Sequence, residues 1–162
     1  MPSSLTIYVD ADACPVAIKE ILFRTAKRLK IETVLIANGG MRIPDSKFIR
    51  IETVPHGADI ADNRIIELMQ AGDIVITGDI PLASRVVKKS GIAIGTRGEL
   101  YDDESVHSRL ATRDLMEQLR SAGVETGGPR PQNTKDVQAF ANQLDKIVTR
   151  LLRKSKRKNE SK

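Results

Sequence analysis

Five aspartates stand out in the sequence, because each one follows a short apolar run or opens a helical pattern. Asp10 and Asp12 come directly after LTIYV, in VDADACP, and Asp79 follows IVIT, in TGDIPLA. Asp59 and Asp62 lie at the start of an amphipathic stretch, in HGADIADNR. Crowded carboxylates repel one another, and a bound divalent cation relieves that repulsion. Hard oxygen ligands with open water positions favour Mg²⁺ or Mn²⁺, ions that polarise phosphates and generate hydroxide for in-line attack.

The elements that must position these side chains alternate between short apolar runs and helical patterns. Strands are predicted over 5–9, 33–37, 48–54, 74–77 and 92–94, and helices over 15–29, 60–70 and 81–89. This alternation predicts an α/β fold, a single three-layer domain whose parallel sheet carries helices on both faces. With strand order 3-2-1-4-5, strands one and four are neighbours, and Asp10 faces Asp79 at the edge where such sheets bind ligands.

The remaining chain is predicted to be helical, with two shorter segments within 103–122, a loop at ETGGPRPQN and a helix over 134–154. Charge is unevenly placed: from Arg150 onward seven basic residues face one acidic residue, a net +6, which leaves −1 for the body of a chain whose total is +5. Basic tails hold nucleic acid or merely keep a protein soluble. We therefore expect a domain over 1–154 and a basic, disordered tail over 155–162.

Composition narrows the class of protein. A length of 162 residues fits one domain, and the single cysteine, Cys14, excludes an internal disulfide and suits a reducing cytosol. No signal peptide or transmembrane stretch is visible. Aromatic residues make up 3% of the chain, without Trp, so platforms for stacking bases are poorly supplied. We expect a soluble cytoplasmic protein with no membrane partner.

Each of these residues also has a plain structural interpretation. An aspartate at a helix start is often only an N-cap worth ~1 kcal/mol, which applies to Asp12 and Asp59 more than to Asp10 and Asp79 at strand ends. Asp62 could simply favour the helix dipole. Three loop arginines suit phosphate binding, and each could equally be an ordinary surface or loop residue: Arg42, Arg97 and Arg130.

Several of these motifs resemble a known family. The runs DADACPVAIKEIL, GADIADNRII, GDIVITGDIPLAS, RGELY and TGGPRP are similar to the YaiI/YqxD family of uncharacterised bacterial proteins. That family in turn resembles PIN-like nuclease domains of the NYN type, in which three aspartates hold Mg²⁺ or Mn²⁺. By position, the resemblance places those roles on Asp10, Asp59 and Asp79, with Asp12 and Asp62 as further metal ligands. One departure is Pro81, where NYN-like sites commonly have another aspartate.

The sequence therefore predicts a phosphodiesterase dependent on Mg²⁺ or Mn²⁺. It would act on RNA, held through phosphate contacts, with a metal-bound hydroxide attacking phosphorus. Two alternatives stay open. A phosphatase similar to the haloacid dehalogenases would use Asp10 as nucleophile, Asp12 as acid and base, and Lys88 or Lys89 as its lysine. A non-catalytic domain would bind RNA or a partner through the tail and the arginines at 97 and 130.

Overall fold

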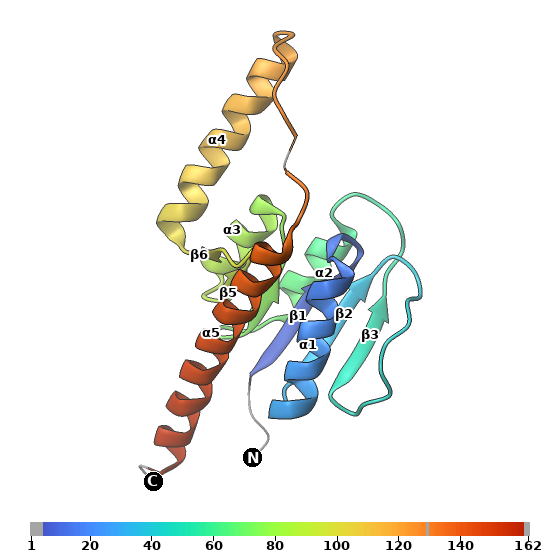
Figure 1. The fold of residues 1–162 in the computed structure, drawn as a ribbon, viewed down its shortest axis with the longest axis vertical. Helices are drawn as coiled ribbons and strands as arrows, with labels where there is room; N and C mark the ends of the chain where they lie inside the picture. The colour runs from blue at the N-terminus through green and yellow to red at the C-terminus, as the bar shows by residue number, and fades with distance from the viewer. Residues whose placement is uncertain (1–4, 129, 161–162) are drawn as a thin grey trace.

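The central sheet has six strands in the order β3-β2-β1-β4-β5-β6 (Figure 1). The computed structural model describes residues 5–128 and 130–160. Five strands run parallel: β1 (Thr6–Asp10), β2 (Glu32–Ala37), β3 (Ile49–Thr53), β4 (Ile74–Ile76) and β5 (Ile92–Ile94). The predicted α/β class and the order 3-2-1-4-5 are confirmed. The sheet gains β6 (Leu100–Tyr101), antiparallel to β5 and too short to show an alternating pattern.

Helices cover both faces of the sheet, as predicted. The side chains of a strand alternate between the faces, so Ile7 and Val9 of β1 join one core and Tyr8 joins the other. The first core lies under α1 (Val16–Leu29) and α5 (Thr134–Glu160), and the second under α2 (Ile60–Leu68) and α3 (Ile80–Lys88). By the same alternation, Asp10 lies on the same face of the sheet as Tyr8, the face covered by α2 and α3.

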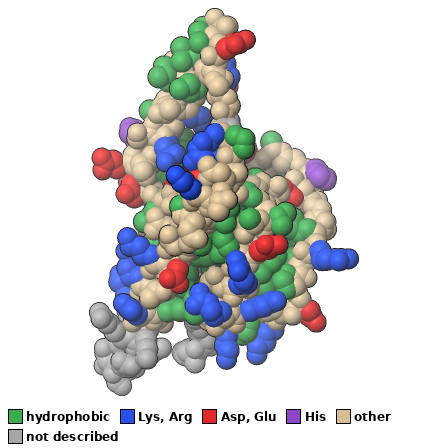
Figure 2. Space-filling model, in the orientation of Figure 1, with side chains coloured by type: hydrophobic (Ala, Val, Ile, Leu, Met, Phe, Trp, Pro, Cys, Tyr) green, Lys and Arg blue, Asp and Glu red, His purple; other side chains and the backbone are tan. Residues whose placement is uncertain are grey.

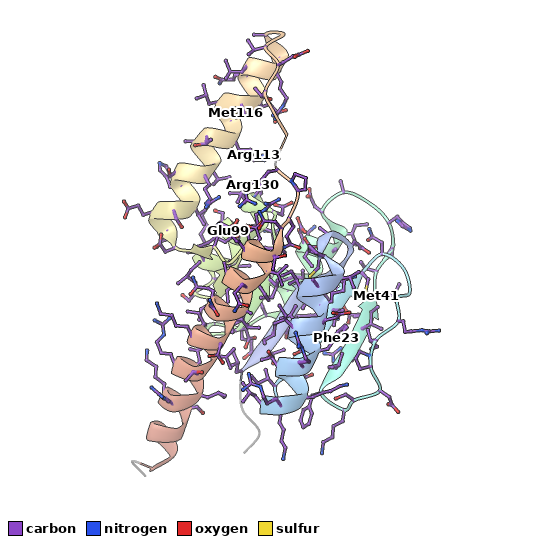
Figure 3. All side chains as sticks on the ribbon, viewed as in Figure 1. Phe23, Met41, Glu99, Arg113, Met116 and Arg130 are labelled. Carbon is purple, nitrogen blue, oxygen red and sulfur yellow. The ribbon has the colours of Figure 1, made fainter. Side chains whose placement is uncertain are left out.

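Helix α4 (Asp103–Ser121) is continuous, so the prediction of two shorter segments within 103–122 is wrong. A capping box opens the helix: the Asp102 carboxylate accepts from the Ser105 N–H, and the Ser105 hydroxyl accepts from the Asp102 N–H. Between Asp102 and Gly123 the chain contains no glycine or proline. The helix packs against α3 near its start, where Val106 is buried, and then projects away from the body, carrying Arg113 and Met116 outward (Figures 1 and 3).

Helix α5 continues through Glu160, past the predicted end at residue 154. The backbone of residues 155–160 is therefore helical where we expected a disordered tail, and residues 161–162 lie outside the described part. The stretch contains Lys, Arg and Glu, which are good helix formers, and neither glycine nor proline. In the part of the chain that the structure describes, no helix is both long and apolar enough to cross a membrane.

The turn between β5 and β6 depends on Gly98, whose φ is +89°. A Cβ there would lie 2.7 Å from the carbonyl carbon and oxygen of Ala139 in α5. Gly123 has nearly the same φ, +86°, but a Cβ there would meet no atom within 4 Å. We expect Gly98→Ala to lower the free energy of unfolding by about 3 kcal/mol and Gly123→Ala by about 1 kcal/mol, measured by urea denaturation. Equal losses would contradict the role of the contact with α5.

Candidate functional site

One buried hydroxyl joins the ends of β1 and β4. These strands pair in parallel, with Val9 opposite Ile76, so their carboxyl ends adjoin. The Thr77 hydroxyl donates to Oδ2 of Asp10 at 3.1 Å, and its oxygen accepts from the Asp79 backbone N–H at 3.0 Å. Because only 1% of Thr77 is exposed, this bridge is shielded from water. It fixes the Asp10 carboxylate relative to the loop that carries Asp79.

The structure changes which aspartates act as helix caps. Asp79 is the N-cap of α3, since its Oδ1 accepts from the Leu82 N–H at 3.0 Å. Asp59 precedes α2 in a left-handed conformation (φ 64°) and makes no side-chain cap bond. Asp12 lies in a short 3₁₀ helix, η1 (Ala11–Ala13), and its Oδ2 accepts from the Asn38 N–H at 2.7 Å, while α1 is preceded by Pro15 as N-cap. The cap interpretation therefore applies to Asp79, and not to Asp12 or Asp59.

The Asp10 carboxyl is half-buried among like charges. Burial raises its pKa above the ordinary value, the hydrogen bond from Thr77 lowers it, and the charges of Asp79 and Asp12 raise it further. Asp12 and Asp79 are themselves exposed. The ends of β1 and β4 thus share one negative field.

Asp62 extends this field to the first turn of α2. Burial, followed by the charges of Asp79, Asp10 and Asp59, raises the pKa of Asp62 to about 6, and Arg85 opposes this only weakly. The five predicted aspartates therefore act on one another electrostatically at one edge of the sheet. We call this set the acidic edge, and keep the name for Asp10, Asp12, Asp59, Asp62 and Asp79.

The donor chemistry of the acidic edge suits a hard divalent cation. In each of Asp10, Asp12 and Asp79, one carboxylate oxygen accepts a hydrogen bond from the protein. No donor among the described residues reaches the other oxygen of each carboxylate. Asn38, beside Asp12, carries a buried side-chain oxygen that has no partner within the described chain. No group of three or more His, Cys, Asp or Glu in that part of the chain forms a ready ligand cage. Mg²⁺ does not require one, because it is commonly held by one or two carboxylates and keeps several waters.

Two residues that contact the acidic edge are absent from the predicted site. Thr77 directly follows β4 and Asn38 directly follows β2, the same positional rule that singles out Asp10 after β1. Both Thr77 and Asn38 are polar residues at the carboxyl end of a strand, so the positional rule extends to them once it is not limited to carboxylates.

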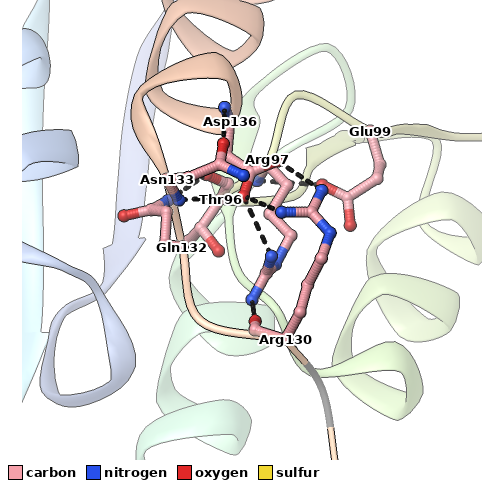
Figure 4. A network of polar contacts seen from close by, with 7 residues as sticks. All are labelled: Thr96, Arg97, Glu99, Arg130, Gln132, Asn133 and Asp136. Atoms are coloured by element: carbon pink, nitrogen blue, oxygen red, sulfur yellow. Dashed lines mark hydrogen bonds and ion pairs between the residues drawn. The ribbon is translucent and has the colours of Figure 1, made fainter.

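Two of the predicted phosphate-binding arginines are engaged in an ion-pair network (Figure 4). Arg130 binds the two carboxylate oxygens of Asp136 at 2.7 Å each, and Arg97 binds Oδ2 at 3.0 Å. Arg97 also donates to the Arg130 carbonyl oxygen. The hydrogen bond from Arg130 lowers the pKa of Asp136, which is only 5% exposed. Both arginines therefore fasten the start of α5 to the turn before β6.

Arg42 stays available for an anion. It is exposed and makes no hydrogen bond or ion pair with any other described residue. It lines a hollow of about 540 Å³ together with Phe23 of α1 and Met41 (Figure 3). This hollow adjoins the segment after β2 that holds Asn38.

Cys14 and the two lysines of the phosphatase alternative lack the surroundings that a reactive group needs. Burial raises the pKa of the Cys14 thiol to about 12, which keeps it protonated and poorly nucleophilic. Lys89 donates to the carbonyl oxygens of Ile66 and Met69. Lys88 ends α3, nine residues after Asp79, so it lies about 13 Å along the helix from the acidic edge.

Asp62→Asn tests the electrostatics of the acidic edge. The folded protein holds the Asp62 proton up to about pH 6, whereas the ordinary value is 3.8, so wild-type stability falls as pH rises from about 4 to about 6. In EDTA we expect the variant to be more stable than wild type at pH 7.5, with the difference gone at pH 4, measured by urea denaturation. Asp114→Asn, on the exposed part of α4, should show no such gain. A variant destabilised equally at both pH values would refute the assigned repulsion.

The chain is similar to a family of bacterial proteins along most of its length. Residues 8–150 match the family model described as "Uncharacterized BCR, YaiI/YqxD family". A UPF0178 protein of Shewanella sediminis is 55% identical over 146 residues, 90% of this chain and 97% of that one. A UPF0178 protein of Hydrogenovibrio crunogenus is 54% identical over 147 residues, which cover 91% of this chain and 97% of that one. A UPF0178 protein of Desulfotalea psychrophila is 52% identical over 147 residues, which cover 91% of this chain and 99% of that one. No solved structure matches. The chain belongs to the YaiI/YqxD family, as its motifs predict.

Proposed function

We propose that this protein is a phosphodiesterase that cleaves RNA and depends on Mg²⁺ or Mn²⁺. The observation that carries the proposal is the bridge made by the Thr77 hydroxyl, which holds the Asp10 carboxylate beside the loop of Asp79 among like charges. Carboxylates whose pKa is raised by burial and by like charges are typical of sites that bind a cation or move a proton.

Asp10 and Asp79, at adjoining strand ends, would hold the ion together with water molecules, and Asp12, Asp59 and Asp62 would tune the site through their charges. Such an ion polarises a phosphate and makes a water molecule easier to deprotonate. Thr77 orients Asp10 and also holds the backbone of Asp79, so it is a positioning residue.

RNA as substrate rests on the resemblance of the motifs to PIN-like nucleases. Arg42 supports an anionic substrate, because it is a free cation on the segment that follows β2. The phosphatase alternative is disfavoured by the position of its lysine, since Lys88 lies at the far end of α3 and Lys89 is bound to backbone carbonyls. The non-catalytic alternative predicts RNA binding without turnover.

Asp10→Asn tests the proposal directly. Labelled single-stranded RNA is incubated with purified protein, with Mn²⁺ or with EDTA, and the products are separated by gel electrophoresis. We expect cleavage only with the metal, and a loss of at least about 100-fold in the variant, because even partners that only orient a metal ligand contribute 10- to 100-fold. Asp114→Asn, with the same change of charge on α4, should cleave like wild type.

Thr77→Val keeps every carboxylate and removes only the bridging hydroxyl. It should reduce cleavage by roughly 10- to 100-fold, whereas Thr33→Val, which removes a buried hydroxyl from β2, should not. Cleavage in EDTA, or equal activity of Asp10→Asn and wild type, would reject the metal-dependent nuclease. Turnover of a phosphomonoester with a trappable aspartyl-phosphate would favour the phosphatase instead.

A further inference from the structure

A groove runs between α1 and α5, on the opposite side of the sheet from α2 and α3. A hollow of about 860 Å³ lies between residues 21–28 of α1 and residues 137–145 of α5. A second hollow, of about 480 Å³, continues along α5 from residue 145 to residue 154. Asp145 lines both, so the two hollows form one groove.

Basic side chains at helical spacing line each part of this groove, those of α1 in the first hollow and those of α5 in the second. Those of α1 are Arg24, Lys27 and Arg28, and those of α5 are Lys146, Arg150, Arg153 and Lys154. Side chains three or four residues apart share one face of a helix, so each set forms a row. Lys and Arg side chains gather over the lower part of this face in Figure 2. We call the feature the basic groove.

Most of this charge has no acidic partner among the side chains that the structure describes. Arg28 and Asp145 form the one ion pair that the described residues make in the groove, with 3.7 Å between nitrogen and oxygen. Their side chains are 60% and 65% exposed, so water screens the pair and its attraction is weak. A row of unpaired cations across a concave surface attracts an extended polyanion.

We propose that the basic groove binds the phosphate backbone of an RNA strand. The choice of RNA rests on the proposed function. Among the described residues no aromatic side chain lines the groove, so bases have nothing to stack on and the contact is made to phosphates. Arg24 lies eight residues beyond Val16, about 12 Å down α1, so the groove holds a part of the strand away from the acidic edge.

The packing of α5 favours nucleic acid over a lipid surface. Its apolar side chains Phe140, Leu144 and Ile147 are buried in the core under the sheet, so no apolar helix face is free to enter a bilayer. The large apolar side chains exposed among the described residues lie outside the groove: Val16, Leu100, Leu115, Met116 and Val124.

Arg24→Gln combined with Arg150→Gln removes one cation from each of the two hollows of the groove. Fluorescence anisotropy of a labelled 20-nucleotide single-stranded RNA is measured with the full chain in EDTA, over a series of salt concentrations. We expect a loss of affinity of roughly tenfold, and a slope of log K against log salt that is smaller by about 1.4, the value for two phosphate contacts. Lys88→Gln combined with Arg113→Gln makes the same charge change on α3 and α4 and should leave both quantities unchanged.

Equal losses in the two double variants, or an unchanged RNA affinity in the groove variant, would overturn the proposal. Loss of binding to phosphatidylserine vesicles alone, with RNA binding intact, would assign the groove to lipid and would overturn it too. Because binding is measured without cleavage, failure of the proposed nuclease activity cannot be mistaken for failure of the groove.

Discussion

β1 and β4 pair in parallel although 64 residues separate Ile74 from Asp10, and the rest of the acidic edge depends on this pairing. Parallel neighbours end at the same side of a sheet, so the loop after each strand meets the loop after the other. Thr77 then lies within hydrogen-bond distance of Asp10 and also accepts from the Asp79 backbone. A change in register of one residue would turn these side chains to the opposite face and separate them.

The two helical layers give the protein two regions of opposite charge. α2 and α3 begin at the acidic edge, where Asp62 and Asp79 lie in or before their first turns. α1 and α5 lie on the other face and carry their cations toward their carboxyl ends, as the helix dipole favours. A polyanion would be attracted to the basic groove, and it would need a bound cation to approach the acidic edge. This arrangement fits the proposed substrate, which would be held at the groove and cut at the edge.

The fold could be predicted from the sequence because apolar runs and helical patterns alternate without ambiguity from residue 5 to residue 94. β6 could not, since two residues show no period, and the continuity of α4 depends on its capping box and its contact with α3. Within the site, strand-end position singles out the aspartates, but it does not tell a helix cap from a free carboxylate. The Asp79 carboxylate caps α3, whereas Asp59 has a left-handed backbone and makes no side-chain cap bond to α2. The engagement of Arg97 and Arg130 depends on Asp136, whose place beside Arg97, 39 residues away, is set by how α5 packs.

Anomalous diffraction from crystals soaked in Mn²⁺ tests most directly whether the acidic edge holds a divalent cation. We expect a peak at the carboxyl ends of β1 and β4, within about 2.5 Å of a carboxylate oxygen of Asp10 and of Asp79, with water at the remaining positions. Crystals that show Mn²⁺ only at other surfaces, or an edge whose carboxylates point apart with no peak between them, would contradict it.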